Sequence, residues 1–120
     1  MSVLVKPGAE FAVIAPGGYL ILDALKAASK SLVLDLTISS GTDGMHSGPG
    51  DPHHFGNAYD VRSHDLDDAT KTKVLAAVMV TLGWAQFFGF VEAPGTDDEH
   101  FHYQTKKGTA YTVLDFLARP

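Results

Sequence analysis

A thirteen-residue stretch, Ser40 to Pro52, limits what this chain can fold into more than any other part of it. It reads Ser-Gly-Thr-Asp-Gly-Met-His-Ser-Gly-Pro-Gly-Asp-Pro, and its four glycines and two prolines prevent a regular helix or strand. In a chain of 120 residues, a loop of this length is more often functional than idle. The regular elements must therefore lie on either side of this loop.

The hydrophobic pattern on each side of the loop indicates a mixture of helices and strands. Every second residue from Leu32 to Ile38 is apolar, which predicts a strand. Apolar residues at helical spacing between Asp67 and Gly83 predict a helix that Asp67 or Asp68 caps. The expected elements are an extended N-terminal arm at 1–18, helices at 19–30, 67–83 and 109–118, and strands at 32–39, 57–63, 84–92 and 100–105.

This order of elements predicts one α+β domain over residues 1–120. The last two strands are separated only by the turn Ala-Pro-Gly-Thr-Asp-Asp at 93–98, so we expect them to form a hairpin. The mixture of strands and helices favours a small antiparallel sheet with flanking helices.

The absence of cysteine narrows the kinds of site that the chain can build. Disulfides and thiolate metal sites are excluded, so a transition metal must be held by histidines and carboxylates. A net charge of -5, with no run of Lys or Arg, argues against a nucleic-acid partner. The longest apolar stretches fall far short of the roughly 20 residues that cross a bilayer, and no signal-peptide pattern is present. We expect a protein made in the cytoplasm that acts at a cell wall only if it is released or exported.

Four of the six histidines fall in two short stretches that also contain acids. Catalytic zinc takes three ligands from His, Asp and Glu and keeps a fourth position for water. Alternate side chains of a strand share a face, so Asp60 and His102 can meet if their strands are neighbours, and His53 can reach them from the end of the loop. Adjacent His54 points the opposite way in extended chain. The sequence thus predicts one zinc ion held by His53, Asp60 and His102.

Two motifs resemble those of the LAS zinc peptidases, and they read His53-x-x-Gly56-x-Ala58-x-Asp60 and Glu99-x-x-His102. That group contains the D-alanyl-D-alanine carboxypeptidases, the L-alanyl-D-glutamate endolysins of phages and the hedgehog signalling domain. The resemblance covers roughly residues 32–104. It implies the hedgehog/D-Ala-D-Ala peptidase fold and the same three zinc ligands.

The resemblance also implies a catalytic base among the acids near the last ligand. The acid three residues before that ligand is commonly the base, and this position is Glu99. Glu92 and Asp97 are alternatives, because the turn between the last two strands can bring either of them close. His100 shares a face with His102 and can stabilise a developing oxyanion.

One part of the LAS pattern is missing from this chain. The group often has an arginine at the end of the strand before the loop, where it binds a substrate carboxylate, and residues 37–46 contain none. His46 and Arg62 are therefore the candidates for that role.

Together these inferences predict a monomeric zinc peptidase that cuts the peptidoglycan stem peptide, as a D,D-carboxypeptidase or as an L-Ala-D-Glu endopeptidase. The alternative is a zinc-containing binding or structural module without hydrolytic activity, for example in a phage particle. A Ser-His hydrolase is disfavoured, because the chain has no Gly-x-Ser-x-Gly motif.

Overall fold

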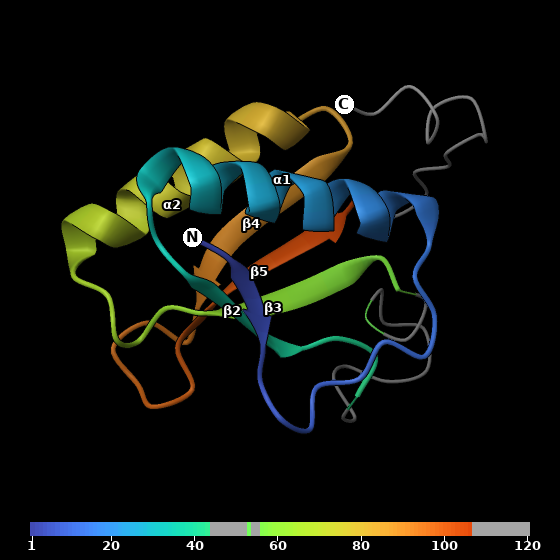
Figure 1. Ribbon diagram of the computed structural model, residues 1–120, viewed down its shortest axis with the longest axis horizontal. Coiled ribbons are helices and arrows are strands. Elements are labelled where there is room, and N and C mark those ends of the chain that lie inside the picture. Colours follow the sequence, from blue (N-terminus) through green and yellow to red (C-terminus); the bar gives the residue numbers. More distant parts are fainter. Residues whose placement is uncertain (44–52, 54–55, 107–120) are drawn as a thin grey trace.

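Five strands form one mixed sheet, and two helices pack against one of its faces (Figure 1). The computed structural model describes residues 1–43, 53 and 56–106, and the elements named here belong to these residues. The helices are α1 (Pro16–Leu32) and α2 (Asp68–Leu82). The strands lie in the order β1-β2-β3-β5-β4, and they are β1 (Val3–Val5), β2 (Leu36–Ser40), β3 (Ala58–Arg62), β4 (Phe87–Glu92) and β5 (His100–Thr105).

Two expectations fall on parts of the chain outside this description. The helix expected at 109–118 and the substrate contact expected from His46 both lie outside the described residues. Neither α1 nor α2 is long and apolar enough to cross a membrane.

The α+β class is confirmed, but the expectation of an antiparallel sheet was wrong at one edge. β1 pairs with β2 in parallel, with Val3 opposite Leu36, so part of the N-terminal arm is a sheet strand. Parallel neighbours need a crossover connection, and α1 supplies it between β1 and β2. The other strand pairs are antiparallel, as expected.

The boundary between α1 and β2 also differs from the expected one. Pro16 begins α1 at a position where its missing N–H costs no hydrogen bond. After Leu32, Val33 adopts a left-handed conformation with φ of 53°, and its N–H donates to the carbonyl of Ser29. The strand therefore begins at Leu36 and not at Leu32. The prediction failed there because Leu32 follows Ala28 at helical spacing, so it fits both patterns.

The second half of the fold follows the sequence expectations more closely. Asp67 caps α2, since its Oδ1 accepts a hydrogen bond from the N–H of Thr70 at 2.7 Å. β4 and β5 form the expected hairpin, with Glu92 opposite His100. β4 begins at Phe87, because residues 84–86 form a turn.

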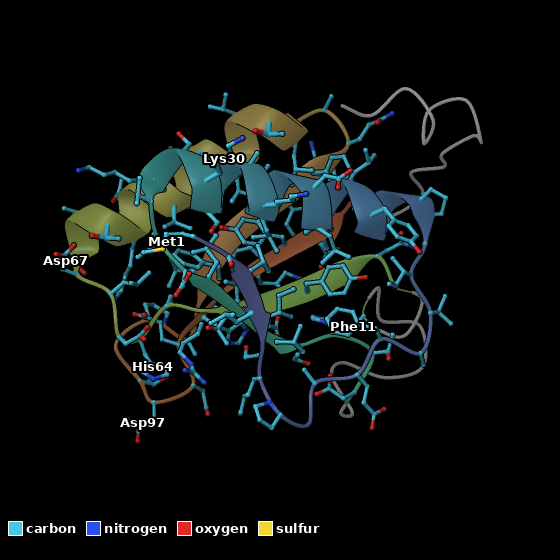
Figure 2. All side chains as sticks on the ribbon, viewed as in Figure 1. Met1, Phe11, Lys30, His64, Asp67 and Asp97 are labelled. Carbon is cyan, nitrogen blue, oxygen red and sulfur yellow. The ribbon has the colours of Figure 1, made fainter. Side chains whose placement is uncertain are left out.

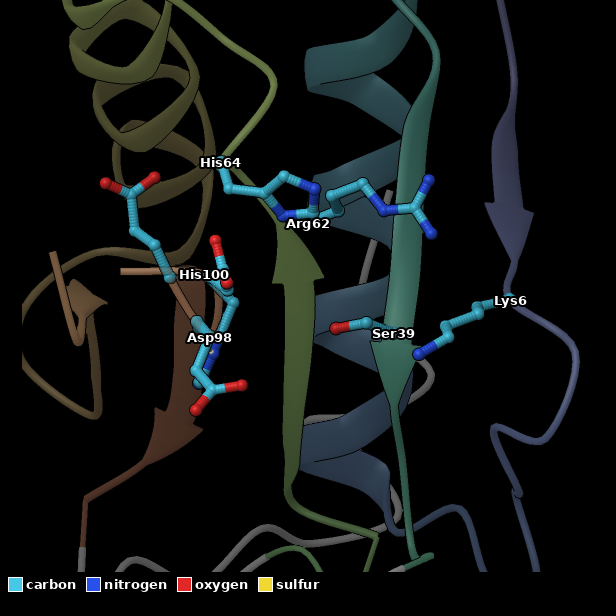
Figure 3. A pocket seen from close by; sticks show the side chains of 8 residues that line it. Lys6, Ser39, Arg62, His64, Asp98 and His100 are labelled. Atoms are coloured by element: carbon cyan, nitrogen blue, oxygen red, sulfur yellow. Dashed lines mark hydrogen bonds between the residues drawn. The ribbon is translucent and has the colours of Figure 1, made fainter. Parts of the chain in front are cut away.

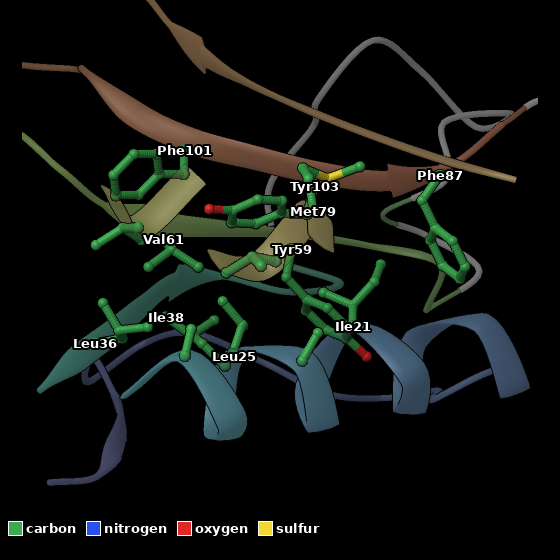
Figure 4. Close-up of a cluster of buried hydrophobic side chains, with 14 residues drawn as sticks. Ile21, Leu25, Leu36, Ile38, Tyr59, Val61, Met79, Phe87, Phe101 and Tyr103 are labelled. Carbon is green, nitrogen blue, oxygen red and sulfur yellow. The ribbon is translucent and has the colours of Figure 1, made fainter. Parts of the chain in front are cut away.

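Alternate residues of the sheet point toward the helices and form the core (Figure 4). Tyr59 on β3 and Phe101 and Tyr103 on β5 are fully buried. The ring of Tyr103 lies against Gly89 on β4, where a Cβ would come within 2.5 Å of it. The packing of this helix-covered face thus depends on a glycine in the neighbouring strand.

The opposite face of the sheet, here called the open face, carries polar and aromatic side chains. The strand registers place on it Asp60 and Arg62 of β3, His100, His102 and Gln104 of β5, and Phe88, Phe90 and Glu92 of β4. Figure 2 shows His64 and Asp97 on this same side, away from α1 and α2. Residues of the two histidine motifs therefore gather where neither described helix covers the sheet.

Candidate metal centre

Asp60 and His102 lie side by side on the open face, because the antiparallel register of β3 and β5 places them opposite each other. The Nδ1 atom of His102 is 3.0 Å from Oδ1 of Asp60. Each residue is only 7% exposed. The pairing of two strands thus brings together two of the three expected ligands.

His53, the third expected ligand, is oriented by the first residues of the long loop. Its Nδ1–H donates to the carbonyl of Gly41 at 2.9 Å. The N-terminal arm holds this segment in place: the N–H of Thr42 donates to the carbonyl of Glu10 at 2.7 Å, and Oδ1 of Asp43 accepts from the N–H groups of Glu10 and Gly41 at 2.9 and 2.8 Å. No sequence pattern indicates the contacts with Glu10, which join residues more than thirty positions apart.

Gly56 makes the turn that carries the chain from His53 into β3. Its φ is 72°, a conformation that favours glycine. A Cβ at this position would lie 2.2 Å from the carbonyl oxygen of Val13 in the N-terminal arm. The motif glycine is therefore needed both for its backbone conformation and for close contact with the arm.

The nearest atoms of the three expected ligands form a triangle of the size that a zinc ion requires. His53 Nε2 is 3.2 Å from Asp60 Oδ1 and 3.3 Å from His102 Nδ1, and the remaining edge, from His102 Nδ1 to Asp60 Oδ1, is 3.0 Å. Ligand atoms about 2.1 Å from a tetrahedral zinc lie about 3.4 Å from one another. The three side chains therefore fit one ion with little movement.

The hydrogen bonds of the two imidazoles leave the correct nitrogen of each ring for a metal. The Nδ1–H of His53 is used by the Gly41 carbonyl. His102 Nε2–H donates to Oε1 of Gln104 at 2.6 Å, and the Gln104 amide group in turn donates to the carbonyl of Thr105. In neutral rings, lone pairs on His53 Nε2 and His102 Nδ1 then face the Asp60 carboxylate. A cation at this point can accept the lone pairs of all three groups, whereas one proton can form a hydrogen bond between only two of them.

The electrostatics of the centre also favour a bound cation. Burial by itself raises the pKa of Asp60, but hydrogen bonds from the protonated rings of His102 and His53 outweigh it and hold this pKa well below its usual range. Burial lowers the pKa of His102, and the hydrogen bond to Asp60 outweighs this effect, so the net pKa is raised. The carboxylate therefore stays ionised and stabilises positive charge beside it.

A second group of side chains adjoins this triangle on the open face. His100 Nε2 lies 2.8 Å from Glu92 Oε1 and 3.5 Å from Asp60 Oδ1. One ligand atom from each of Asp60, Glu92, His100 and His102 lies within 4.8 Å of the others, close enough for these residues to bind a metal ion. The structure therefore contains two adjoining sets of possible ligands, the inner set His53, Asp60 and His102, and the outer pair Glu92 and His100.

Glu99, the residue expected to be the catalytic base, does not belong to this group. It is buried at the end of the hairpin turn, just before β5, where it accepts hydrogen bonds from Ser63 Oγ at 2.8 Å, Lys71 Nζ at 2.9 Å and the N–H of Gly95 at 3.1 Å. The bond from Lys71 is the largest cause that lowers the pKa of Glu99 to about 2. Glu99 lies just before β5, and its carboxylate faces Ser63 and Lys71 instead of His102.

A pocket with a cavity volume of about 320 Å³ opens beside His100. Figure 3 shows Lys6 and Arg62 on one side of it and Asp98 and His100 on the other. Among the described residues, neither Lys6 nor Arg62 forms an ion pair with an acid. Arg62, a candidate for binding a substrate carboxylate, lines this pocket. Asp97, an alternative candidate for the catalytic base, lines it as well. Lys6 was not expected, because it comes from the N-terminal arm.

An aromatic surface lies on the β4 side of the centre. The rings of Phe88 and Phe90 are stacked with centroids 6.0 Å apart, and the Phe90 ring lies 5.2 Å from that of His102. Phe90 is 39% exposed, so it offers apolar surface to a ligand next to the ligand triangle. The open face therefore has cationic groups on one side of the centre and aromatic groups on the other.

Comparison of the chain with protein-family models, with curated proteins and with solved structures gave no match. The inference of function therefore depends on the geometry of the open face and on the two sequence motifs.

Proposed function

We propose that this protein is a zinc peptidase that hydrolyses a peptide bond in the peptidoglycan stem peptide. The observation that carries the proposal is the convergence of His53, Asp60 and His102 on one point, with Glu92 and His100 beside it. Two imidazoles and a carboxylate suit zinc, and three protein ligands leave a position for water. The resemblance of both motifs to the LAS peptidases supports the same reaction.

When bound, zinc would supply a Lewis acid that lowers the pKa of a coordinated water to about 7. Glu92 takes the role of general base in this proposal: its Oε1 accepts the proton of the attacking water and delivers it to the leaving amine. His100 Nδ1–H donates to the carbonyl of Asp98 at 2.6 Å, which turns Nε2 toward the centre. From there, protonated Nε2 donates a hydrogen bond to the oxyanion that develops on the substrate carbonyl.

The pocket beside His100 supports a substrate with a carboxylate near the bond that is cut. Lys6 and Arg62 supply two cations without acidic partners among the described residues, and Arg62 can bind a carboxylate through two parallel N–H groups. Stem peptides carry such carboxylates, both at their C-terminus and on D-glutamate. Both the D,D-carboxypeptidase and the L-Ala-D-Glu endopeptidase therefore fit this pocket.

Release of free amines from purified peptidoglycan tests the proposal. We expect the zinc-loaded protein to release amines, and we expect Glu92→Gln to lower the rate by about 10²–10⁴-fold without loss of bound zinc. Glu99→Gln is the matched control, since it changes an acid of the same hairpin that lies outside the metal group. A Glu99→Gln protein that is folded and inactive, beside an active Glu92→Gln protein, would contradict the assignment of the base.

A second candidate function is a zinc-containing module that binds its ligand without hydrolysis. The observation that favours it is the position of Glu99, which forms hydrogen bonds with Ser63, Lys71 and Gly95 and does not reach the metal group. If the protein binds one zinc per chain and binds peptidoglycan without releasing amines, this second candidate replaces the first.

A further inference from the structure

The open face has more metal-binding groups than one tetrahedral ion uses. Three imidazoles and two carboxylates, one of them that of Asp60, lie close together there, and a zinc site with an open position takes three such groups. The inner set His53, Asp60 and His102 already meets that need. Glu92 and His100 are left over, only 2.8 Å apart, on the solvent side of Asp60.

We propose that Glu92, His100 and Asp60 form a second, weaker site for a divalent cation of the zinc type. The same oxygen of Asp60, Oδ1, faces His53 and His102 on one side and His100 on the other, so this atom would bridge the inner ion and the outer ion. Carboxylate-bridged pairs of metal ions lie about 3.5–4 Å apart in proteins. The 3.5 Å distance between His100 Nε2 and Asp60 Oδ1 matches the separation of about 3.4 Å between two ligand atoms on one tetrahedral zinc, and the half-exposed Glu92 can join them after a small shift.

The orientation of His100 supports this site independently of the inner set. The carbonyl of Asp98 accepts the Nδ1–H of His100, so Nε2 faces Glu92 and Asp60. In a neutral ring, a lone pair at Nε2 then points at two carboxylates. A cation between these groups satisfies them together, and an imidazole with two carboxylates selects zinc-type ions over Mg²⁺ or Ca²⁺.

The charges of the site explain why the second ion binds more weakly. Asp60 and Glu92 carry two negative charges, and the first dication neutralises them. A second dication then enters a site that has no net negative charge left to attract it. Glu92 and His100, the ligands of the outer ion, are also more exposed than Asp60 and His102. We therefore expect occupancy of the outer site only when free zinc is in excess.

A consequence for catalysis rests on the proposed function, in which Glu92 is the general base. An ion on Glu92 would occupy the oxygen that accepts the proton of water. Excess zinc should therefore inhibit amine release, while the first equivalent of zinc supports it.

Equilibrium dialysis against buffered zinc, followed by measurement of zinc per chain, tests the inference. Wild type should take up one ion at low free zinc and a second ion at free zinc at least about tenfold higher. Glu92→Gln should keep the first ion and lose the second, and Asp97→Asn, which removes an exposed acid of the same hairpin, should bind two ions like wild type. If Glu92→Gln does not fold, His100→Gln replaces it and should give the same result.

The possible outcomes separate this inference from the proposed function. A wild-type protein that never exceeds one zinc per chain, or a Glu92→Gln protein that still binds two, overturns the second site and leaves the peptidase proposal standing. A protein that binds no zinc overturns both. Cobalt titration gives a second readout, because filling a site of different geometry should add a distinct absorption band that Glu92→Gln lacks.

Discussion

Glu99 and His100 are neighbours in the sequence and line the same pocket, yet their side chains bond to different parts of the molecule. Glu99 is enclosed by Ser63, Lys71 and Gly95, and its carboxylate stabilises the packing of the hairpin against the start of α2. His100 faces Asp60 and Glu92 on the open face. The carboxylate of Glu99 has its hydrogen-bond partners inside the protein. The polar groups around His100 instead face one another on the open face.

The difference shows that the same motif brings different side chains together on a helix and on a strand. Glu-x-x-His on a helix places both side chains on one face, because residues three apart are neighbours there. On a strand the same spacing places them on opposite faces. His102 belongs to β5, whereas Glu99 precedes this strand and bonds to Ser63 and Lys71, so it is Glu92 that reaches the centre across the hairpin.

The largest expected effects come from adjacent residues of β5, one on each face. Phe101→Ala should lower the free energy of unfolding by about 3–5 kcal/mol, because it removes a fully buried ring from the core. His102→Ala should abolish tight zinc binding while lowering the stability of the zinc-free protein much less. Chemical denaturation and zinc content measure the two effects. If His102→Ala unfolds the zinc-free protein as strongly as Phe101→Ala does, the division between the two faces is wrong.

A smaller effect should follow from loosening the arm that orients His53. Asp43→Ala removes the acceptor for the N–H groups of Glu10 and Gly41, so the Gly41 carbonyl is less well fixed behind the imidazole. We expect zinc affinity to fall by about tenfold, the low end for groups that support a ligand. Asp43→Asn keeps an acceptor oxygen and serves as the control. Equal affinity in Asp43→Ala and wild type would show that the arm does not position His53.

The role of Glu99 in stability should appear as a dependence on pH. Its pKa is lowered from 4.5 to about 2 by Lys71, Ser63 and Gly95. A carboxyl group whose pKa is lower in the folded state adds stability above its unfolded pKa and loses it as the pH falls through its folded pKa. The melting temperature of Glu99→Gln should thus lie below that of wild type at pH 6, and the gap should shrink as the pH falls from about 4.5 to about 2. A gap that stays constant over this range would show that the charge of Glu99 does not stabilise the fold.

The smallest effect is expected at Tyr103, on the covered face of β5. Its hydroxyl is buried, and it has no hydrogen-bond partner among the described residues. Burial also raises the pKa of this phenol. Tyr103→Phe should be neutral or should raise the free energy of unfolding by about 1 kcal/mol. A loss of more than about 1 kcal/mol on denaturation would mean that the hydroxyl is satisfied by a group outside the described part of the chain.

Much of the fold could be predicted from the sequence because its signals are local. Periodicity and capping located α2 and β5, and the short turn at 93–98 identified the hairpin. The edge strand β1 could not be found in this way, because three apolar residues carry too little pattern and their partner β2 lies about thirty residues away. The same limit applies to Lys6, which reaches the pocket only because β1 joins the sheet.

The sequence by itself determined which residues could meet at a metal: the alternation of β3 and β5 places Asp60 and His102 on faces that coincide once the strands pair, and Gly56 allows the turn from His53. Only the tertiary structure decided which acid stands beside them. That choice depends on which face of the sheet the helices cover and on the register of the β4–β5 hairpin, and both result from packing between segments and not from local spacing. Lys71 on α2 therefore holds Glu99, and β4 brings Glu92 to the open face.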